Sequence, residues 1–420
     1  MTPMHPQVLL QNFKGNRSAS IDEYRANGGY EALTRALLER TPAEVEQMVL
    51  AAGLRGRGGA GFPAGKKWSL IPEGAAHPRF VVVNADEMEP GTYKDRMVIH
   101  VDPHLIIEGV ILTSYAVSAE KAYIFIRPSY ESSALILERE LEVARREGLL
   151  GQNILGSEFS LDIVVHRSAG RYICGEATAL LNALMGKRPN PKQPPPYATE
   201  KGLWNLPTVV GNVETTACVA PIVRNAITGG SGEPAFTKLY CVSGKVKRPG
   251  CYELPMGTPL REIIEEAAGG LPEGSELKAV LPGGVSTRYM TPDLYDTPMD
   301  FDSLAKIGHR LGTGAIIVFD QHTCMVAATL NIIQFFARES CGWCTPCREG
   351  LPYIRDILTQ IESGEGKDEM IPKLRRMSEH LWRTYCAFSP GAVSPLESLL
   401  TYFEDEVREH IRMKRCPFRK

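Results

Sequence analysis

Hydrophobic and polar positions in the first half of the chain predict alternating helices and strands. After Thr41, apolar residues recur at helical spacing, namely at Val45, Met48, Val49 and Ala52. Residues 41–44 read Thr-Pro-Ala-Glu, a capping-box pattern with proline at the first helical position, and Gly53 is a C-terminal stop signal. The pattern predicts a helix between Thr41 and Gly53 with one buried face.

Two short apolar runs predict buried strands, one at residues 79–84 and one at 122–127. Helical patterns occupy residues 105–118 and 132–147. Strands that alternate with helices between about residues 50 and 190 are typical of an α/β domain.

The second half of the chain changes character twice. Short strands are expected at 238–242, 251–254 and 277–281, with a helix over 260–268, which predicts a small α+β module. The last hundred residues carry helical apolar stripes and predict a helical bundle. We therefore expect a multidomain chain of mixed α/β and α+β class. Its predicted parts are a lead-in (1–45), an α/β domain (46–235), the small module (236–320) and the bundle (321–420).

Composition excludes several classes of function. The formal net charge is -2, without the basic excess typical of nucleic-acid binders. No apolar run approaches the roughly 20 residues that cross a bilayer, and the polar N-terminus lacks a signal-peptide core. We expect no membrane insertion, no secretion and a reducing compartment, in which ten cysteines are not a disulfide framework. Six cysteines are scattered singly: Cys174, Cys218, Cys241, Cys251, Cys324 and Cys416. The basic tail over residues 412–420 is expected to be a solvated terminus.

The other four cysteines form a candidate metal centre. Cys341, Cys344 and Cys347 make a CxxCxxC run, and Cys386 follows later in the chain. Three thiolates at this spacing reach three corners of a cuboidal cluster, and a distant fourth completes it. A four-thiolate zinc site is the alternative, but zinc sites usually use two separated CxxC pairs. The arrangement favours a [4Fe–4S] cluster over zinc and over ordinary buried cysteines.

Two polar segments of the α/β region are candidate ligand sites. Residues 56–61 match GxGxxG, but a helix precedes them and Phe62-Pro63 follows, so the standard Rossmann interpretation fails. The loop still allows close backbone approach to a ring or phosphate, with Lys67 as a point charge, unless it is a plain surface loop. Residues 84–96 follow a strand with acidic groups, which suits binding of ribityl or ribose hydroxyls or else is a solvated acidic loop.

Taken together, the motifs resemble the F-type flavoprotein subunit of bacterial complex I (NADH-quinone oxidoreductase). The matching stretches are GLRGRGGAGFPAGKKW, NADEMEPGTYKDR, AGRYICGEATALL, NVET, ESCGWCTPCREG and YCAFSPGA, which run from residue 53 to 392 in family order. The resemblance implies a non-standard Rossmann-like FMN and dinucleotide domain, a ubiquitin-like β-grasp (SLBB) module and a bundle carrying the cluster. The implied activity is hydride transfer from NADH to FMN, followed by single electrons to the [4Fe–4S] cluster and onward to a quinone.

The resemblance also implies roles for particular residues. Those that would hold FMN or line its site are Gly58, Gly59, Ala60, Gly61, Lys67, Asn84, Asp86, Glu87, Tyr172, Gly175, Gly211, Asn212 and Thr215. Phe62, Glu89 and Tyr197 would face the dinucleotide. Glu89 and Glu176 are the candidate catalytic residues within this site.

The sequence departs from the family pattern at Ala177, where a second glutamate is common. A glutamate there would accept a hydrogen bond from the adenosine 2'-hydroxyl and repel a 2'-phosphate. Its loss predicts a relaxed preference for NAD(H) that admits NADP(H), unless another residue compensates. Further departures are Pro194, Gly211 and the pair Pro128-Ser129.

The resemblance leaves alternatives for the complex. Related flavoproteins serve NAD(P)-linked hydrogenases, formate dehydrogenases and bifurcating complexes, but those often carry extra [2Fe–2S] or ferredoxin domains that this chain is expected to lack. A scaffold that keeps the cluster without dinucleotide oxidation is a second alternative. The expected partners are a small, E-type [2Fe–2S] protein and a large, G-type iron–sulfur protein of the same complex. The expected location is cytoplasmic, peripheral to the inner face of the cell membrane.

Overall fold

The computed structural model describes residues 7–15, 17–229 and 237–419, and these residues divide into two compact units. The first unit comprises residues up to Met88, Tyr93–Leu239 and Glu253–Met256. The second comprises Glu89–Thr92, Tyr240–Tyr252 and Gly257 onward. The domain boundaries expected at residues 45, 235 and 320 stay predictions.

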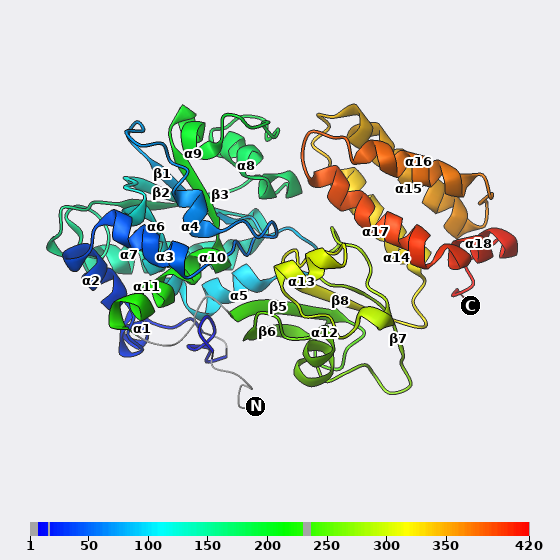
Figure 1. Ribbon diagram of the computed structural model, residues 1–420, viewed down its shortest axis with the longest axis horizontal. Helices are drawn as coiled ribbons and strands as arrows, with labels where there is room; N and C mark the ends of the chain where they lie inside the picture. The colour runs from blue at the N-terminus through cyan, green and yellow to red at the C-terminus, as the bar shows by residue number, and fades with distance from the viewer. Residues whose placement is uncertain (1–6, 16, 230–236, 420) are drawn as a thin grey trace. The chain divides into compact units, whose positions relative to one another are not determined.

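A four-stranded parallel sheet in the order β3-β2-β1-β4 forms the centre of the first unit (Figure 1). Its strands are β1 (Phe80–Ala85), β2 (Lys121–Ile126), β3 (Asp162–Arg167) and β4 (Thr208–Asn212). Val81, Val82 and Val83 are buried in succession, because a parallel sheet covered on both faces needs apolar residues on both. The strands expected at 79–84 and 122–127 are confirmed within one residue.

Helices cover this sheet. They are α1 (Ile21–Ala26), α2 (Glu31–Glu39), α3 (Pro42–Ala51), α4 (Ala64–Trp68), α5 (Lys94–Val101), α6 (Pro103–Ala116), α7 (Glu131–Arg146), α8 (Ala177–Leu184), α9 (Ala198–Lys201), α10 (Val213–Ala217) and α11 (Val219–Thr228). Short 3-10 turns are η1 (Pro128–Tyr130), η2 (Ile154–Gly156), η3 (Tyr172–Gly175) and η4 (Leu203–Asn205). The capping box expected at Thr41 is confirmed, since Thr41 and Glu44 each accept from the other's backbone N–H.

α6 is the central helix of this unit and packs against β1, β2 and α7. Nearly all of its residues are buried, including Glu108, whose carboxylate accepts from the backbone N–H groups of Tyr30 and Leu33. This carboxylate attaches the polar lead-in to the core. Within the described residues no single helix is long and apolar enough to span a membrane. α5 and α6 meet that criterion only as a pair, bent by 102°.

A second four-stranded sheet, in the order β6-β5-β8-β7, is mixed. β5 pairs parallel with β8, and β7 pairs antiparallel with β8. Its strands are β5 (Thr237–Gly244), β6 (Gly250–Pro255), β7 (Leu277–Leu281) and β8 (Ala315–Asp320), accompanied by η7 (Pro292–Leu294) and α13 (Phe301–Lys306). The helix expected over 260–268 is present but irregular. It begins as α12 (Leu260–Glu262) and continues as the π-helical turn η6 (Ile263–Ala267).

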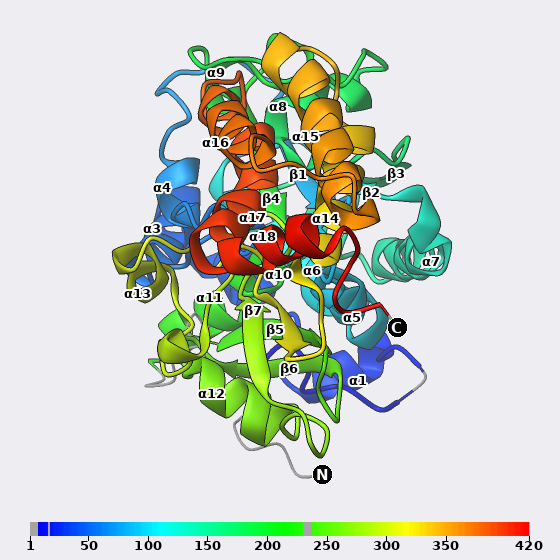
Figure 2. The same ribbon diagram turned by 90° about the vertical axis from the view of Figure 1, so that its right-hand side faces the viewer.

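Five helices form the C-terminal bundle, and Figure 2 shows them together. They are α14 (Met325–Glu339), α15 (Thr345–Ser363), α16 (Met370–Leu381), α17 (Phe388–Tyr402) and α18 (Glu404–Met413). α14 packs on α15 and α17, and α16 bridges α15 and α17. The stripe Leu351, Ile354, Leu358 and Ile361 is buried, as the helical spacing predicted. The multidomain fold class is confirmed.

Candidate functional site

The candidate flavin site lies at the carboxyl edge of the parallel sheet in the first unit. β1 and β4 are neighbouring strands, and Asn84 of β1 is in register with Asn212 of β4. Parallel strands end on the same edge, and open α/β sheets bind ligands there. The strand register thus brings together two of the predicted residues, whose segments are far apart in the sequence.

The glycine loop packs against the start of α10. The Arg57 N–H donates to Thr215 Oγ1 at 2.8 Å, and a Cβ added to Gly58 would lie 3.2 Å from the Cβ of Asn212. Gly59 and Gly61 have φ values of 123° and 67°, a region that favours glycine. The loop therefore adopts a path that few other residues allow, with Gly58 and Ala60 exposed and Gly61 buried.

The acidic end of β1 is joined to η3. Asn84 Oδ1 accepts from the Asp86 N–H at 3.0 Å, and Asn84 Nδ2 donates to the Gly175 carbonyl at 3.3 Å. Asp86 Oδ1 accepts from Ser168 Oγ at 2.9 Å. A Cβ added to Gly175 would meet no atom within 4 Å. The protein's own packing therefore leaves open space beside this glycine, which lies with the half-buried Tyr172 on the same turn.

Glu87 points into the protein rather than into open space. It is 7% exposed and accepts from the Asp95 N–H at 3.0 Å and from Tyr130 Oη at 3.1 Å. Burial, together with the nearby charge of Asp95, raises the pKa of Glu87 to about 7. Its oxygens hold the start of α5, and a direct role toward a flavin stays a prediction.

A buried network of charges, which the sequence did not reveal, supports Asn212. Lys94 Nζ lies 2.7 Å from Asp95 Oδ1, 3.0 Å from Glu214 Oε2 and 3.2 Å from Asn212 Oδ1. Lys238 Nζ lies 2.9 Å from the same Glu214 oxygen. Asn212 Nδ2 in turn donates to Asp95 Oδ2 at 2.7 Å.

The network keeps Glu214 charged in the interior. Burial alone would raise the pKa of Glu214, but the ammonium groups of Lys238 and Lys94 outweigh burial and lower that pKa to about 2. Lys94 and Glu214 both lie in motifs that the family resemblance singled out. Nothing in their spacing, however, pairs two residues so far apart.

The remaining predicted residues of the first unit differ in their surroundings. Lys67 Nζ donates to the Val210 carbonyl at 3.1 Å, and burial lowers its pKa. Phe62 and Tyr197 are 43% and 55% exposed, so both rings are available for stacking. Glu176 caps α8, since its carboxylate accepts from the Ala179 N–H at 2.8 Å. Gly211 is half-buried in β4.

Glu89 belongs to the second unit. Its Oε1 accepts from the Ser286 N–H at 2.8 Å, and its side chain fills the space where a Cβ of Gly284 would lie. The structure thus groups this carboxylate with the loop after β7. Its expected place beside a dinucleotide stays a prediction.

The four cluster cysteines meet at one end of the α14–α15 pair. The Tyr385 N–H lies 3.4 Å from Cys344 Sγ, which brings the segment of Cys386 to the CxxCxxC loop. Ser340 Oγ lies 3.3 Å from Cys347 Sγ. Cys341, Cys344 and Cys386 are half-buried, and Cys347 is buried. Thiolates on one loop and one adjacent segment, with polar groups near the sulfurs, suit an iron–sulfur cluster.

Comparisons with known proteins agree with these two sites. The family descriptions that match are "Nuo51 FMN-binding domain" over residues 49–221, "SLBB domain" over 239–288 and "NADH-ubiquinone oxidoreductase-F iron-sulfur binding region" over 327–410. The fold and the sites thus define a flavin- and iron–sulfur-binding protein, and the expected FMN and [4Fe–4S] cofactors are confirmed.

Similar proteins identify the family. The NADH-quinone oxidoreductase F subunit numbered 2 of Rhizobium meliloti is 46% identical and covers 99% of this chain and 100% of that protein. The F subunit of Escherichia coli is also 46% identical, over 93% of this chain and 90% of that protein. A structure of an NAD+-reducing [NiFe]-hydrogenase in the H2-reduced state superimposes with a TM-score of 0.81 at 33% identity. It covers 96% of this chain and 67% of that chain. This chain belongs to the family of NADH-quinone oxidoreductase F subunits.

Proposed function

We propose that the chain is the electron-input subunit of a respiratory NADH:quinone oxidoreductase. Gly58, Asn84 and Asn212 converge at the carboxyl edge of the sheet, in a chain that also carries four cluster cysteines, and this convergence supports the proposal most directly. Bound FMN supplies the conversion of two-electron to one-electron chemistry, because it takes a hydride from NADH and releases electrons singly to the [4Fe–4S] cluster.

The chain's own residues would position and shield these groups. The glycine loop and Gly175 leave backbone open to a planar ring, and Asn84 and Asn212 are held by their own hydrogen bonds. Preorganised polar groups of this kind lose little freedom on binding. Phe62 and Tyr197 would stack on the adenine, and Glu89 and Glu176 would contact the dinucleotide near the reacting atoms.

Gly175→Val tests the flavin site. The added side chain would enter space that the protein leaves open, so FMN affinity should fall by more than about tenfold, or roughly 1.4 kcal/mol. The unfolding temperature of the flavin-free chain should change by no more than about 2 °C. Ala76→Val, in an exposed loop before β1, is the control. Unchanged FMN affinity in Gly175→Val would remove Gly175 from the site.

Ala177 makes the nucleotide preference testable. It is the first residue of α8 and half-buried. Without a carboxylate there, we expect kcat/KM for NADH to exceed that for NADPH by less than about a thousandfold, or roughly 4 kcal/mol. Ala177→Glu should increase this ratio at least about tenfold by repelling the 2'-phosphate. A wild-type ratio above a thousandfold, unaltered in the variant, would contradict the idea.

The partners and location follow from the same proposal. We infer that the chain binds a small, E-type [2Fe–2S] protein and a large, G-type iron–sulfur protein on the inner face of the cell membrane. The likeness to the NAD+-reducing hydrogenase supports a second candidate, an NAD(P)-linked hydrogenase or a related complex. Copurification from the native cell separates the two, because membrane-arm proteins favour the first and a hydrogenase catalytic protein favours the second.

A further inference from the structure

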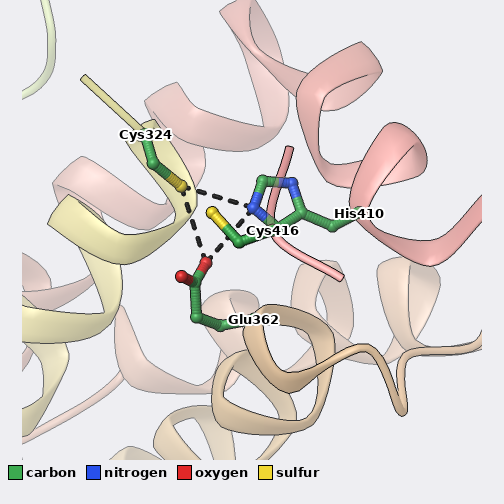
Figure 3. Close-up of side chains that lie close together, drawn as sticks. All are labelled: Cys324, Glu362, His410 and Cys416. Carbon is green, nitrogen blue, oxygen red and sulfur yellow. Dashed lines mark hydrogen bonds and ion pairs between the residues drawn. The ribbon is translucent and has the colours of Figure 1, made fainter. Parts of the chain in front are cut away.

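A second cluster of ligand side chains lies in the C-terminal bundle, apart from the four cluster cysteines. Figure 3 shows Cys324, Glu362, His410 and Cys416 pointing toward one another. Cys324 caps α14, Glu362 lies in the last turn of α15, His410 lies on α18 and Cys416 is in the tail. One ligand atom from each residue lies within 4.8 Å of the other three.

The spacing of these atoms suits one metal ion. Cys324 Sγ lies 3.3 Å from His410 Nε2 and 3.5 Å from Glu362 Oε2, and those two atoms are 3.2 Å apart. Ligand atoms of a tetrahedral zinc ion are about 3.3–3.8 Å apart, because Zn–N and Zn–O bonds are about 2.0–2.2 Å and Zn–S bonds about 2.3 Å. The three measured distances are thus close to the edges of such a tetrahedron.

The orientation of His410 prepares a lone pair for a cation. His410 Nδ1 lies 2.7 Å from the carbonyl of Glu406, which can only accept a hydrogen bond, so Nδ1 carries the proton. Nε2 of the neutral ring then directs its lone pair toward Cys324 Sγ and Glu362 Oε2. A backbone carbonyl that fixes the tautomer in this way is the usual support of a metal-bound histidine.

The burial of the group makes a compensating charge necessary. Cys324 is 9% exposed, Glu362 6%, Cys416 3% and His410 fully buried. A carboxylate and thiolates in such surroundings are costly unless a cation or protons neutralise them. Arg419 lies 3.2 Å from the other carboxylate oxygen, Oε1, and so leaves Oε2 directed at the cluster. The Ala327 N–H donates to Cys324 Sγ at 3.2 Å, which favours the thiolate.

We propose that Cys324, Glu362, His410 and Cys416 form a closed structural Zn²⁺ site. Two sulfurs, one imidazole nitrogen and one carboxylate oxygen are the donor types of zinc and are too soft for Mg²⁺ or Ca²⁺. Four protein ligands leave no open position, so the ion stabilises structure and takes no substrate.

The zinc site is distinct from the iron–sulfur site. α14 begins beside Cys324 and ends just before Cys341, while α15 begins within the CxxCxxC run and ends beside Glu362. The two helices have 15 and 19 residues, or about 22 and 28 Å at 1.5 Å per residue. The two sites therefore lie at opposite ends of this helix pair. The zinc ion would fasten the C-terminal tail to the bundle that holds the cluster.

Metal content of the full chain, purified anaerobically after growth with zinc, tests the proposal. We expect about one zinc per chain in addition to the cluster iron, and X-ray absorption should show two sulfur and two nitrogen or oxygen ligands. A zinc ion bound to four sulfurs would mean that it occupies the cluster cysteines, and this would overturn the proposal. The result does not depend on NADH oxidation, so it can fail or succeed separately from the proposed function.

Variants assign the site to its residues. Cys416→Ser and His410→Gln should lose the zinc and keep the iron, whereas Cys341→Ser should lose iron and keep zinc. Cys251→Ser, outside both groups, is the matched control and should keep both metals. If the zinc-site variants do not fold, Co²⁺ titration of the zinc-depleted wild-type chain should give thiolate-to-cobalt absorption. No uptake of either ion, or a Cys324–Cys416 disulfide in the anaerobic protein, would overturn the proposal.

Discussion

Single residues at the candidate flavin site are held mainly by the protein itself. Asn212 caps α10 and is bonded to both Lys94 and Asp95, and Glu214 of the same helix neutralises two buried lysines. Removing one partner from a buried charge group typically costs about 3–5 kcal/mol. The site thus depends on charges that do not face the ligand.

Glu87 makes the stability of the first unit depend on pH. Its pKa of about 7 lies above the usual 4.5, so between these values the folded chain binds more protons than the unfolded chain. Stability should therefore fall as pH rises from about 5 to 7, by at most about 1.4 kcal/mol per pH unit, and then level off. Glu87→Gln should lack this contribution.

Unfolding temperatures of the flavin-free wild type and Glu87→Gln, measured between about pH 5 and 8, test this expectation. Asp102 is an internal control, because burial also raises its pKa to about 7 and its contribution is the same in both proteins. Parallel pH profiles for the two proteins would contradict the assignment of the slope to Glu87.

At the scale of elements, α8 connects a structural role with a functional one. Glu176 caps this helix, and the proposal also places it beside the dinucleotide. Glu176→Ala should lower stability by about 1 kcal/mol, whereas Glu176→Ser should keep the cap. Both variants should lower kcat for NADH. Wild-type turnover in Glu176→Ser would leave the residue with capping alone.

Elements with a local signal could be predicted from the sequence. The apolar run of β1 and the capping box at Thr41 appear in the structure where they were expected, because each depends only on neighbouring residues. The π-helical turn at Ile263–Ala267 was not expected, since a helical stripe does not distinguish one pitch from another. The approach of Lys94 to Glu214 and of Cys324 to Cys416 depends on tertiary packing, for which sequence spacing carries no signal.

At the scale of the whole chain, the four-cysteine motif predicted the iron–sulfur region, and the glycine loop required the family resemblance before it indicated FMN. The basic tail was expected to be a solvated terminus, yet Cys416 within it is 3% exposed and faces the candidate zinc ligands. A compositional argument could not find this contact, because it treats the tail without its partners on α14, α15 and α18.

The central claim is that this chain takes a hydride from NADH at bound FMN and passes electrons to its own [4Fe–4S] cluster. An anaerobic titration of the flavin- and cluster-loaded chain with NADH, followed by flavin absorbance and by electron paramagnetic resonance on the same samples, tests it most directly. We expect the flavin absorbance to bleach and the signal of the reduced cluster to rise, whereas Cys341→Ser should keep the bleaching and lose the cluster signal. Bound FMN that neither NADH nor NADPH bleaches would contradict the account.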